Sequence, residues 1–175
     1  ILMADGMRQA LIVSTRGWDK RSVMEPQTES VVRGPREGFT ENFRTNTALL
    51  RRRIKSPQLR MDHTVIGQRT QTNVCVAYLA DVADPEVVAT VKARLNNLNV
   101  DSVLDSGYIE QYIEDAPYSI FPTIGGTEKP DTAAAKVLEG RVAILVEGSP
   151  FVLTAPMLFM ESFQSSEDYY IRTLI

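Results

Sequence analysis

The segment Glu25–Pro57, EPQTESVVRGPREGFTENFRTNTALLRRRIKSP, organises the chain because it combines a loop, a helix and most of the clustered positive charge. Two glycines and a proline, Gly34, Gly38 and Pro35, stiffen the loop by favouring unusual or fixed backbone angles. The charged residues of this loop are Arg33, Arg36 and Glu37. A stiff loop that carries charge is typical of specific contacts, and the alternative interpretation is a solvated turn.

The second half of this segment predicts a helix with Thr40 as its N-cap and its end near Lys55, before Ser56-Pro57. An inward stripe recurs at spacings of four, three and four residues, and it consists of Phe43, Thr47, Leu50 and Ile54. The basic residues of the last turns are Arg51, Arg52, Arg53 and Lys55. They complement the helix dipole, or alternatively form a docking surface for an acidic protein, lipid headgroups or nucleic acid.

Charge is distributed unevenly along the chain. Net charge is −3, which gives no general indication of nucleic-acid binding. Residues 33–60 include eight basic and two acidic residues of the chain's 19 and 22, so the remainder has 11 basic and 20 acidic residues. A basic region on an acidic body favours self-association or contact with an acidic surface. Binding of nucleic acid through the basic helix is therefore the weaker alternative, since no recognisable module accompanies it.

The remaining elements predict an α/β fold with mixed sheets and flanking helices. Strands are expected at 10–15, at 59–65 by alternation, at 73–80 with apolar residues on both faces, and at 141–146 paired with 151–155 as a hairpin. Helices are expected after Asp84-Pro85-Glu86, from Ser106 as a cap through Glu114, and at 132–138 capped by Asp131.

The domain organisation follows from a Pro/Gly-rich stretch at 116–130. We predict a first α/β subdomain at 1–115, incomplete at its N-terminus, then a linker at 116–130, and a second part at 131–175 with the helix and the hairpin. The predicted ligand cleft beside this linker would be lined by Gly125, Gly126, Thr127 and Lys129. As a phosphate loop this pattern is incomplete, because the lysine–serine end of a Walker motif is absent.

Catalytic and metal-binding patterns are weak. His63 is the only histidine, so neither a histidine-based metal site nor a serine–histidine–aspartate arrangement is expected. The acid pair Glu25/Glu29 is unspecific, and Cys75, the single cysteine, is predicted to be a buried, unreactive thiol. We therefore expect no enzyme activity, no metal and no cofactor. No apolar run approaches the roughly 20 residues that a membrane-spanning helix needs.

Three ordered blocks of residues resemble the spore germination receptor A-subunit family (GerA type). The first is Glu25-Pro26, Glu29, 33–41, Asn46 and 49–54. The second is Phe121-Pro122, 127–131 and 138–146, and the third is 150–153, 163–165 and 168–170. Two features depart from the family: Lys129 stands where arginine is usual, and the family's soluble region begins upstream of Ile1.

This resemblance implies a non-catalytic, soluble N-terminal domain of a nutrient germinant receptor A subunit, acting in receptor assembly and signal transmission. The implied partners are the B and C subunits and other A-subunit copies, with membrane helices beyond Ile175 anchoring the parent protein in the spore inner membrane. The domain would lie on the cytosolic, spore-core side. We expect Arg33, Arg36, Glu37, Arg51, Arg52 and Arg53 to make contacts within or between subunits. The alternative is a domain that binds a small germinant; neither the germinant nor the number of copies follows from the sequence.

Overall fold

The computed structural model describes residues 22–26, 28–29, 34–114 and 122–158. The predicted strand at 10–15, Arg33, and the predicted aromatic and acidic segment from residue 159 onward lie outside the described residues. The described part contains a mixed α/β fold with four helices and five strands, which confirms the predicted fold class.

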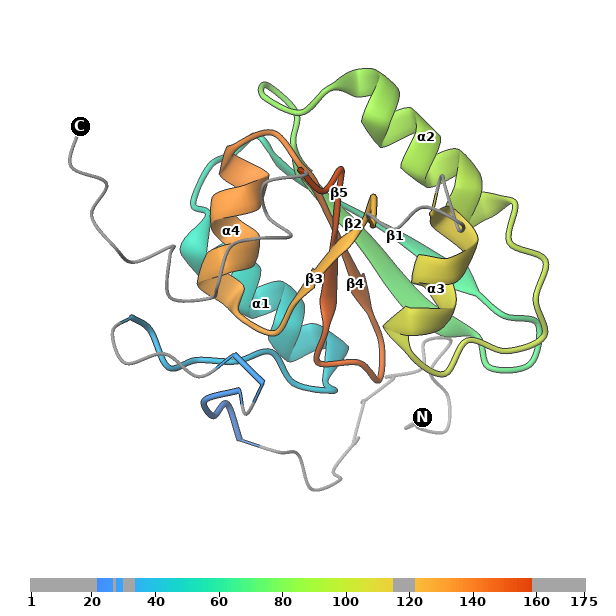
Figure 1. Ribbon diagram of the computed structural model, residues 1–175, viewed down its shortest axis with the longest axis horizontal. Helices are drawn as coiled ribbons and strands as arrows, with labels where there is room; N and C mark the ends of the chain where they lie inside the picture. Colours follow the sequence, from blue (N-terminus) through green and yellow to red (C-terminus); the bar gives the residue numbers. More distant parts are fainter. Residues whose placement is uncertain (1–21, 27, 30–33, 115–121, 159–175) are drawn as a thin grey trace, which may run out of the picture.

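A single antiparallel sheet forms the centre of the fold (Figure 1). Its strands are β1 Leu59–Ile66, β2 Thr72–Leu79, β3 Gly125–Thr127, β4 Val142–Val146 and β5 Val152–Ala155. Their spatial order is β1-β2-β4-β5-β3, with β1 and β3 at the edges. The predicted strands at 59–65 and 73–80 and the hairpin of β4 and β5 are confirmed.

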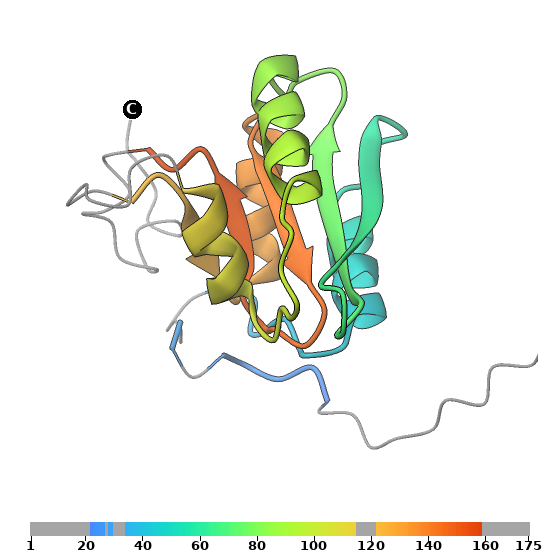
Figure 2. The same ribbon diagram turned by 90° about the vertical axis from the view of Figure 1, so that its right-hand side faces the viewer.

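Two helices cover each face of the sheet (Figure 1 and Figure 2). They are α1 Phe43–Arg53, α2 Pro85–Asn96, α3 Ser106–Ile113 and α4 Pro130–Leu138. On one face α1 and α4 contribute Leu50 and Val137 to a core with Cys75 and Leu145. The opposite face carries α2 and α3.

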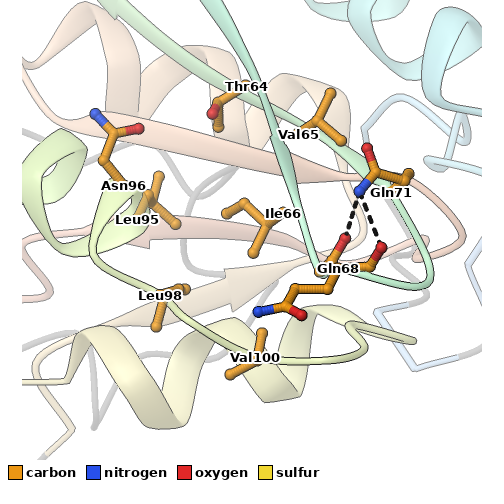
Figure 3. Close-up of a pocket in the computed structure, with 10 residues that line it drawn as sticks. Thr64, Val65, Ile66, Gln68, Gln71, Leu95, Asn96, Leu98 and Val100 are labelled. Atoms are coloured by element: carbon orange, nitrogen blue, oxygen red, sulfur yellow. Dashed lines mark hydrogen bonds between the residues drawn. The ribbon is translucent and has the colours of Figure 1, made fainter.

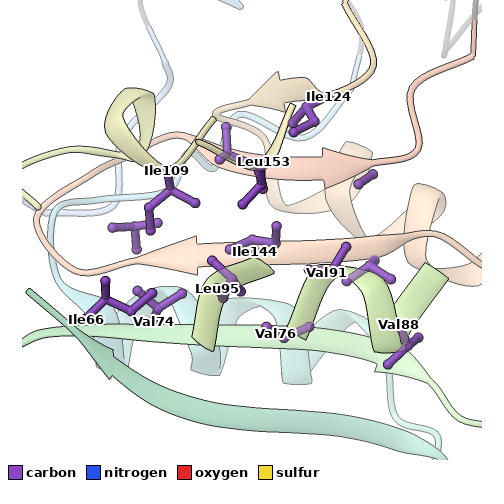
Figure 4. Packing of buried hydrophobic residues seen from close by; sticks show 14 of the residues in the cluster. Ile66, Val74, Val76, Val88, Val91, Leu95, Ile109, Ile124, Ile144 and Leu153 are labelled. Carbon is purple, nitrogen blue, oxygen red and sulfur yellow. The ribbon is translucent and has the colours of Figure 1, made fainter. Parts of the chain in front are cut away.

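The second core lies under α2 and α3 (Figure 4). Val76 and Ile144 of the sheet pack with Val91 and Leu95 of α2 and Ile109 of α3. Alternate residues of β2 and β4 thus point into the two cores, and every residue of β4 is buried. This is the two-sided burial that the continuous apolar run at 73–80 indicated.

Helix α1 begins three residues after its predicted N-cap. The side chain of Asn42, rather than Thr40, accepts the hydrogen bond from the Thr45 amide, at 3.0 Å. Thr40 is instead held by Asn46, whose Oδ1 accepts from the Thr40 amide at 2.8 Å. Asn46 and Leu49 are buried, although the predicted stripe omitted both, so the buried face is rotated toward Asn46.

The other helix starts agree with prediction or differ from it by one or two residues. Asp84 caps α2 as predicted, since its Oδ1 accepts from the Glu86 amide at 2.8 Å. Ser106 is the first residue of α3 rather than its cap, and its buried hydroxyl lies 2.9 Å from that of Ser149. Lys129, not Asp131, occupies the N-cap position of α4, because Pro130 begins the helix.

The predicted linker is corrected where it is described. Gly125–Thr127 form β3, which pairs with β5, and Pro130 already belongs to α4. The strands that precede residue 116 share one sheet with those that follow it, because β2 pairs with β4. The boundary placed at residue 116 falls within 115–121, outside the described residues, and stays a prediction. No helix among the described residues is long and apolar enough to cross a membrane.

Replacing Leu50 by alanine should lower the free energy of unfolding by about 2–5 kcal/mol. The smaller side chain buries less apolar surface and leaves a cavity in the packed core. Leu50 is 0% exposed, whereas Leu138 at the end of α4 is 55% exposed. The same change at Leu138 should alter stability by only about 0.5 kcal/mol. Urea unfolding followed by circular dichroism measures both, and equal losses would contradict the packing described here.

Candidate functional site

Backbone hydrogen bonds join parts of the segment before α1 to each other and to the rest of the fold. The Gly38 amide donates to the Met24 carbonyl at 2.9 Å, and the Phe39 amide donates to the Glu128 carbonyl at 2.7 Å. A Cβ on Gly38 would lie 2.8 Å from the Met24 oxygen, so this close approach requires glycine. Phe39 is 1% exposed and joins the core under α1 and α4.

Two side-chain contacts join the same segment to the corner between β3 and α4. The Thr127 hydroxyl donates to Oε2 of Glu29 at 2.8 Å, and the Thr28 hydroxyl donates to Oε2 of Glu128. Burial raises the pKa of Glu29, and it outweighs the hydrogen bond from Thr127 and the nearby positive charge of Lys129, which act to lower it. These acids therefore connect segments of the chain rather than line a cleft.

The residues of the predicted ligand cleft lie in β3 and at the start of α4. Gly125, Gly126 and Thr127 form β3, and Lys129 is 1% exposed. A Cβ on Gly125 would lie 3.2 Å from the Thr154 hydroxyl and 3.4 Å from Nζ of Lys136, so glycine permits the tight packing here. The prediction that these residues bind a ligand stays a prediction.

The predicted interaction residues separate into distinct contacts. Glu37 lies between two arginines of α1: its Oε1 is 2.6 Å from Nη2 of Arg52, and its Oε2 is 2.8 Å from Nη2 of Arg53. Partial burial acts to raise the pKa of Glu37, but the hydrogen bonds from both arginines outweigh it and lower that pKa. The charge-bearing loop and the end of α1 are therefore joined within one chain.

The other members of the predicted set lie apart from Glu37. Nε of Arg36 is 3.7 Å from Oε2 of Glu25, and the Arg36 side chain is 71% exposed. Nε of Arg51 contacts Sδ of Met61 on β1 at 3.0 Å. Arg51, Arg52 and Arg53 are all exposed, so this end of α1 presents positive charge to solvent.

An open groove of about 410 Å³ lies between α1 and Val23 of the segment that precedes it. Its floor is apolar, and its lining residues are Val23, Asn42, Arg44, Thr45, Ala48, Leu49 and Arg52. We did not predict this groove from the sequence. The available signal was the small residue Ala48 between Arg44 and Arg52, at successive steps of four residues.

The opposite side of the sheet is acidic. Residues 81–114, which include α2 and α3, contain seven acidic and two basic residues, whereas residues 34–60 contain seven basic and two acidic residues. Because α1 and α2 with α3 cover opposite faces, the two charge excesses lie on opposite sides of the sheet (Figure 2).

A smaller pocket of about 240 Å³ lies between the β1–β2 turn and the C-terminal end of α2 (Figure 3). Its lining residues include Thr64, Gln68, Gln71, Asn96 and Leu98, and none of its ten lining residues is ionisable. The turn is held against the following loop, since the Gln68 amide donates to the Val100 carbonyl at 3.0 Å. Such a pocket suits a small uncharged polar molecule.

The remaining predicted reactive side chains occupy ordinary positions. Cys75 is buried in the sheet, and burial raises the pKa of its thiol to about 12, which agrees with an unreactive thiol. His63 is exposed on edge strand β1 and packs edge-on against Phe43, with 5.6 Å between ring centroids. Across the ranges that the structure describes, no three His, Cys, Asp or Glu side chains are grouped so as to hold a metal ion.

Replacing Glu29 by glutamine should stabilise the fold at neutral pH and have little effect at acidic pH. The raised pKa means that the folded state binds a proton more readily than the unfolded state. Native stability is therefore lost as the pH rises from the ordinary glutamate pKa through the raised one. The amide oxygen of glutamine can still accept from Thr127. Thermal unfolding of both proteins across this pH range measures the difference.

Glu37→Gln supplies the control of opposite sign. Because the pKa of Glu37 is lowered, its contribution is present above the ordinary glutamate pKa and is lost as pH falls through the lowered one. This variant should be less stable than the native chain at neutral pH and equal to it at the most acidic pH. Two variants with the same pH dependence would contradict the assignment.

Comparison with known proteins gives a consistent result. A family model described as Bacillus/Clostridium GerA spore germination protein matches residues 1–175. Spore germination protein KA of Bacillus subtilis is 49% identical over 172 residues, which are 98% of this chain and 32% of that protein. The membrane protein YfkQ of the same organism, described as uncharacterized, is 51% identical over 175 residues, 100% of this chain and 34% of that protein.

A solved structure also matches. The crystal structure of the N-terminal domain of the A subunit of the Bacillus megaterium spore germinant receptor GerK3 is 48% identical, with a TM-score of 0.56 over 70% of this chain and 97% of that one. The chain spans about a third of the length of the curated relatives it matches. With the family model covering every residue, the chain belongs to the Bacillus/Clostridium GerA spore germination protein family.

Proposed function

We propose that this chain is the N-terminal domain of a germinant receptor A subunit and acts, without catalysis, in receptor assembly and in transmission of the germination signal. One observation supports assembly above the others: the basic and the acidic excess lie on opposite sides of one sheet. Complementary charge on two surfaces steers association and fixes its register. A domain with both signs on opposite sides can contact a neighbour on each side.

The proposed partners are the B and C subunits of the receptor and further copies of the A subunit. The relatives that support this proposal include spore germination protein KA and the solved domain of a germinant receptor A subunit. The parent protein would be held in the spore inner membrane by segments outside this chain, with the domain on the spore-core side. Contacts through Arg33, Arg36, Glu37 and the arginines of α1 belong to this proposal.

A structural role also accounts for the half-buried Glu29 and the buried Glu128. Glu29 and Glu128 fasten the segment before α1 to the corner of β3 and α4, over sequence separations of 98 and 100 residues. Chains of packed side chains and hydrogen-bond networks can carry energetic coupling between distant sites. We propose that these two hydrogen bonds let the domain transmit movement as one rigid unit.

Reversing the charge of Arg51, Arg52 and Arg53 together, to glutamate, should weaken assembly of the full-length subunit by at least about tenfold, because like charges would then face an acidic neighbour. Co-purification of two differently tagged subunits measures assembly, and nutrient-triggered germination measures function. Native assembly together with native germination in this variant would overturn the proposal.

Two controls separate assembly from folding. Arg44→Glu reverses an exposed charge on the same helix without removing a partner of Glu37, so it should weaken assembly while preserving the unfolding temperature. Arg69→Glu changes an 83% exposed side chain in the β1–β2 turn. It should leave assembly unchanged, since this turn lies away from α1.

A second candidate function is binding of a small molecule, favoured by the uncharged pocket between the β1–β2 turn and α2 (Figure 3). A ligand that binds the folded chain raises its unfolding temperature by mass action. Neutral polyols and sugars should then raise it at millimolar concentration, and charged amino acids should not. Absence of any shift up to saturating concentration would contradict this candidate.

A further inference from the structure

The outer side of α1 is shaped to receive a helix. Arg44, Ala48 and Arg52 follow one another at steps of four residues, so they form a row with about 6 Å between successive members. The middle member is an alanine, which leaves the groove between the two arginines open to its apolar floor at Leu49. Glu37 holds one wall in place through its 2.6 Å contact with Arg52.

The outer side of α3 has the complementary shape. Tyr108 and Tyr112 are 46% and 55% exposed and also lie four residues apart, while Ile109 and Ile113 of the same helix are buried. Leu104, 64% exposed, lies in the loop just before α3. Tyrosine and arginine are the side chains enriched where proteins bind one another, and two exposed tyrosines in a row form a ridge of the kind that enters a groove.

The charges on α3 also call for a basic partner. Glu110 lies on the other flank of α3 from the tyrosines, because residues two apart on a helix do not face each other, and Glu114 is the C-cap that follows the helix. Burial and then the negative charges of Glu114 and Asp105 raise the pKa of Glu110. This negative charge around α3 favours the approach of a basic surface.

The geometry points to a specific contact between copies: the tyrosine ridge of α3 in one copy enters the α1 groove of a second copy, with Tyr108 and Tyr112 beside Ala48 and between Arg44 and Arg52. This inference rests on the proposed role in assembly and names the surfaces. In this contact the arginines lie over the tyrosine rings as cation–π pairs.

The contact uses two different surfaces on opposite sides of the sheet, so each copy retains one free groove and one free ridge. Such an interface is heterologous, and repetition of it gives a ring or an open row of subunits rather than a closed pair.

Disulfide trapping in the full-length subunit tests this contact. One tagged copy carries Ala48→Cys and a second, differently tagged copy carries Tyr112→Cys. The native Cys75 does not interfere, because it is 0% exposed and its thiol has a pKa of about 12. Under mild oxidation the mixed copies should give a cross-linked dimer with both tags, at least about tenfold above the level from either copy alone.

Leu138→Cys replaces Tyr112→Cys in the matched control, because Leu138 is equally exposed, at 55%, but lies on α4. It should give no mixed dimer with Ala48→Cys. A mixed dimer at the same level in this control, or a disulfide between two Tyr112→Cys copies alone, would overturn the inference.

A second variant distinguishes this contact from assembly in general. Tyr108→Ser with Tyr112→Ser removes the ridge without changing a charge, and should reduce co-purification of two tagged subunits by at least about tenfold. If this variant assembles normally while reversal of the three arginines abolishes assembly, the proposed function holds and the tyrosine contact is wrong. If neither change affects assembly, both fail.

Discussion

Burial of β2 and β4 on both faces is the constraint on which the rest of the structure depends. Every residue of β4 is buried, and alternate residues of β2 enter two separate cores. A sheet with two apolar faces must be covered twice, which requires helices on both sides. The chain meets this requirement with α1 and α4 on one face and α2 and α3 on the other, and the charges that each helix carries are thereby separated by the full thickness of the sheet.

Local patterns predicted the elements that local physics decides. Asp84-Pro85-Glu86 predicted the start of α2, since capping depends on neighbours within one turn. The start of α1 was predicted wrongly. The side chain of Asn46, six residues away, accepts a hydrogen bond from the Thr40 amide, and Asn42 caps the helix instead. Strand β3 carried no pattern at all, as Gly125–Thr127 offers neither alternation nor bulk, and only pairing with β5 makes it a strand.

In the candidate site, too, the sequence predicted local features and missed contacts between residues that are distant in sequence. Clustered arginines predicted a basic surface, but the sequence did not reveal that Glu37 is held by Arg52 and Arg53 fifteen and sixteen residues away. The residues at β3 were predicted to line a cleft; Thr127 and Glu128 also contact the segment before α1, and ligand binding there stays a prediction. A glycine pair permits both close backbone approach and an open loop, so its sequence alone does not distinguish them.

Separation of charge across the sheet also limits the kinds of assembly that this domain can enter. Two copies that met through the same surface would bring basic against basic or acidic against acidic residues, which costs several kcal/mol. Contact between unlike surfaces avoids this cost and leaves a basic and an acidic surface free at the two ends of any row of copies. Both faces of the sheet between these two surfaces are packed, and a packed interior has low compressibility and transmits strain.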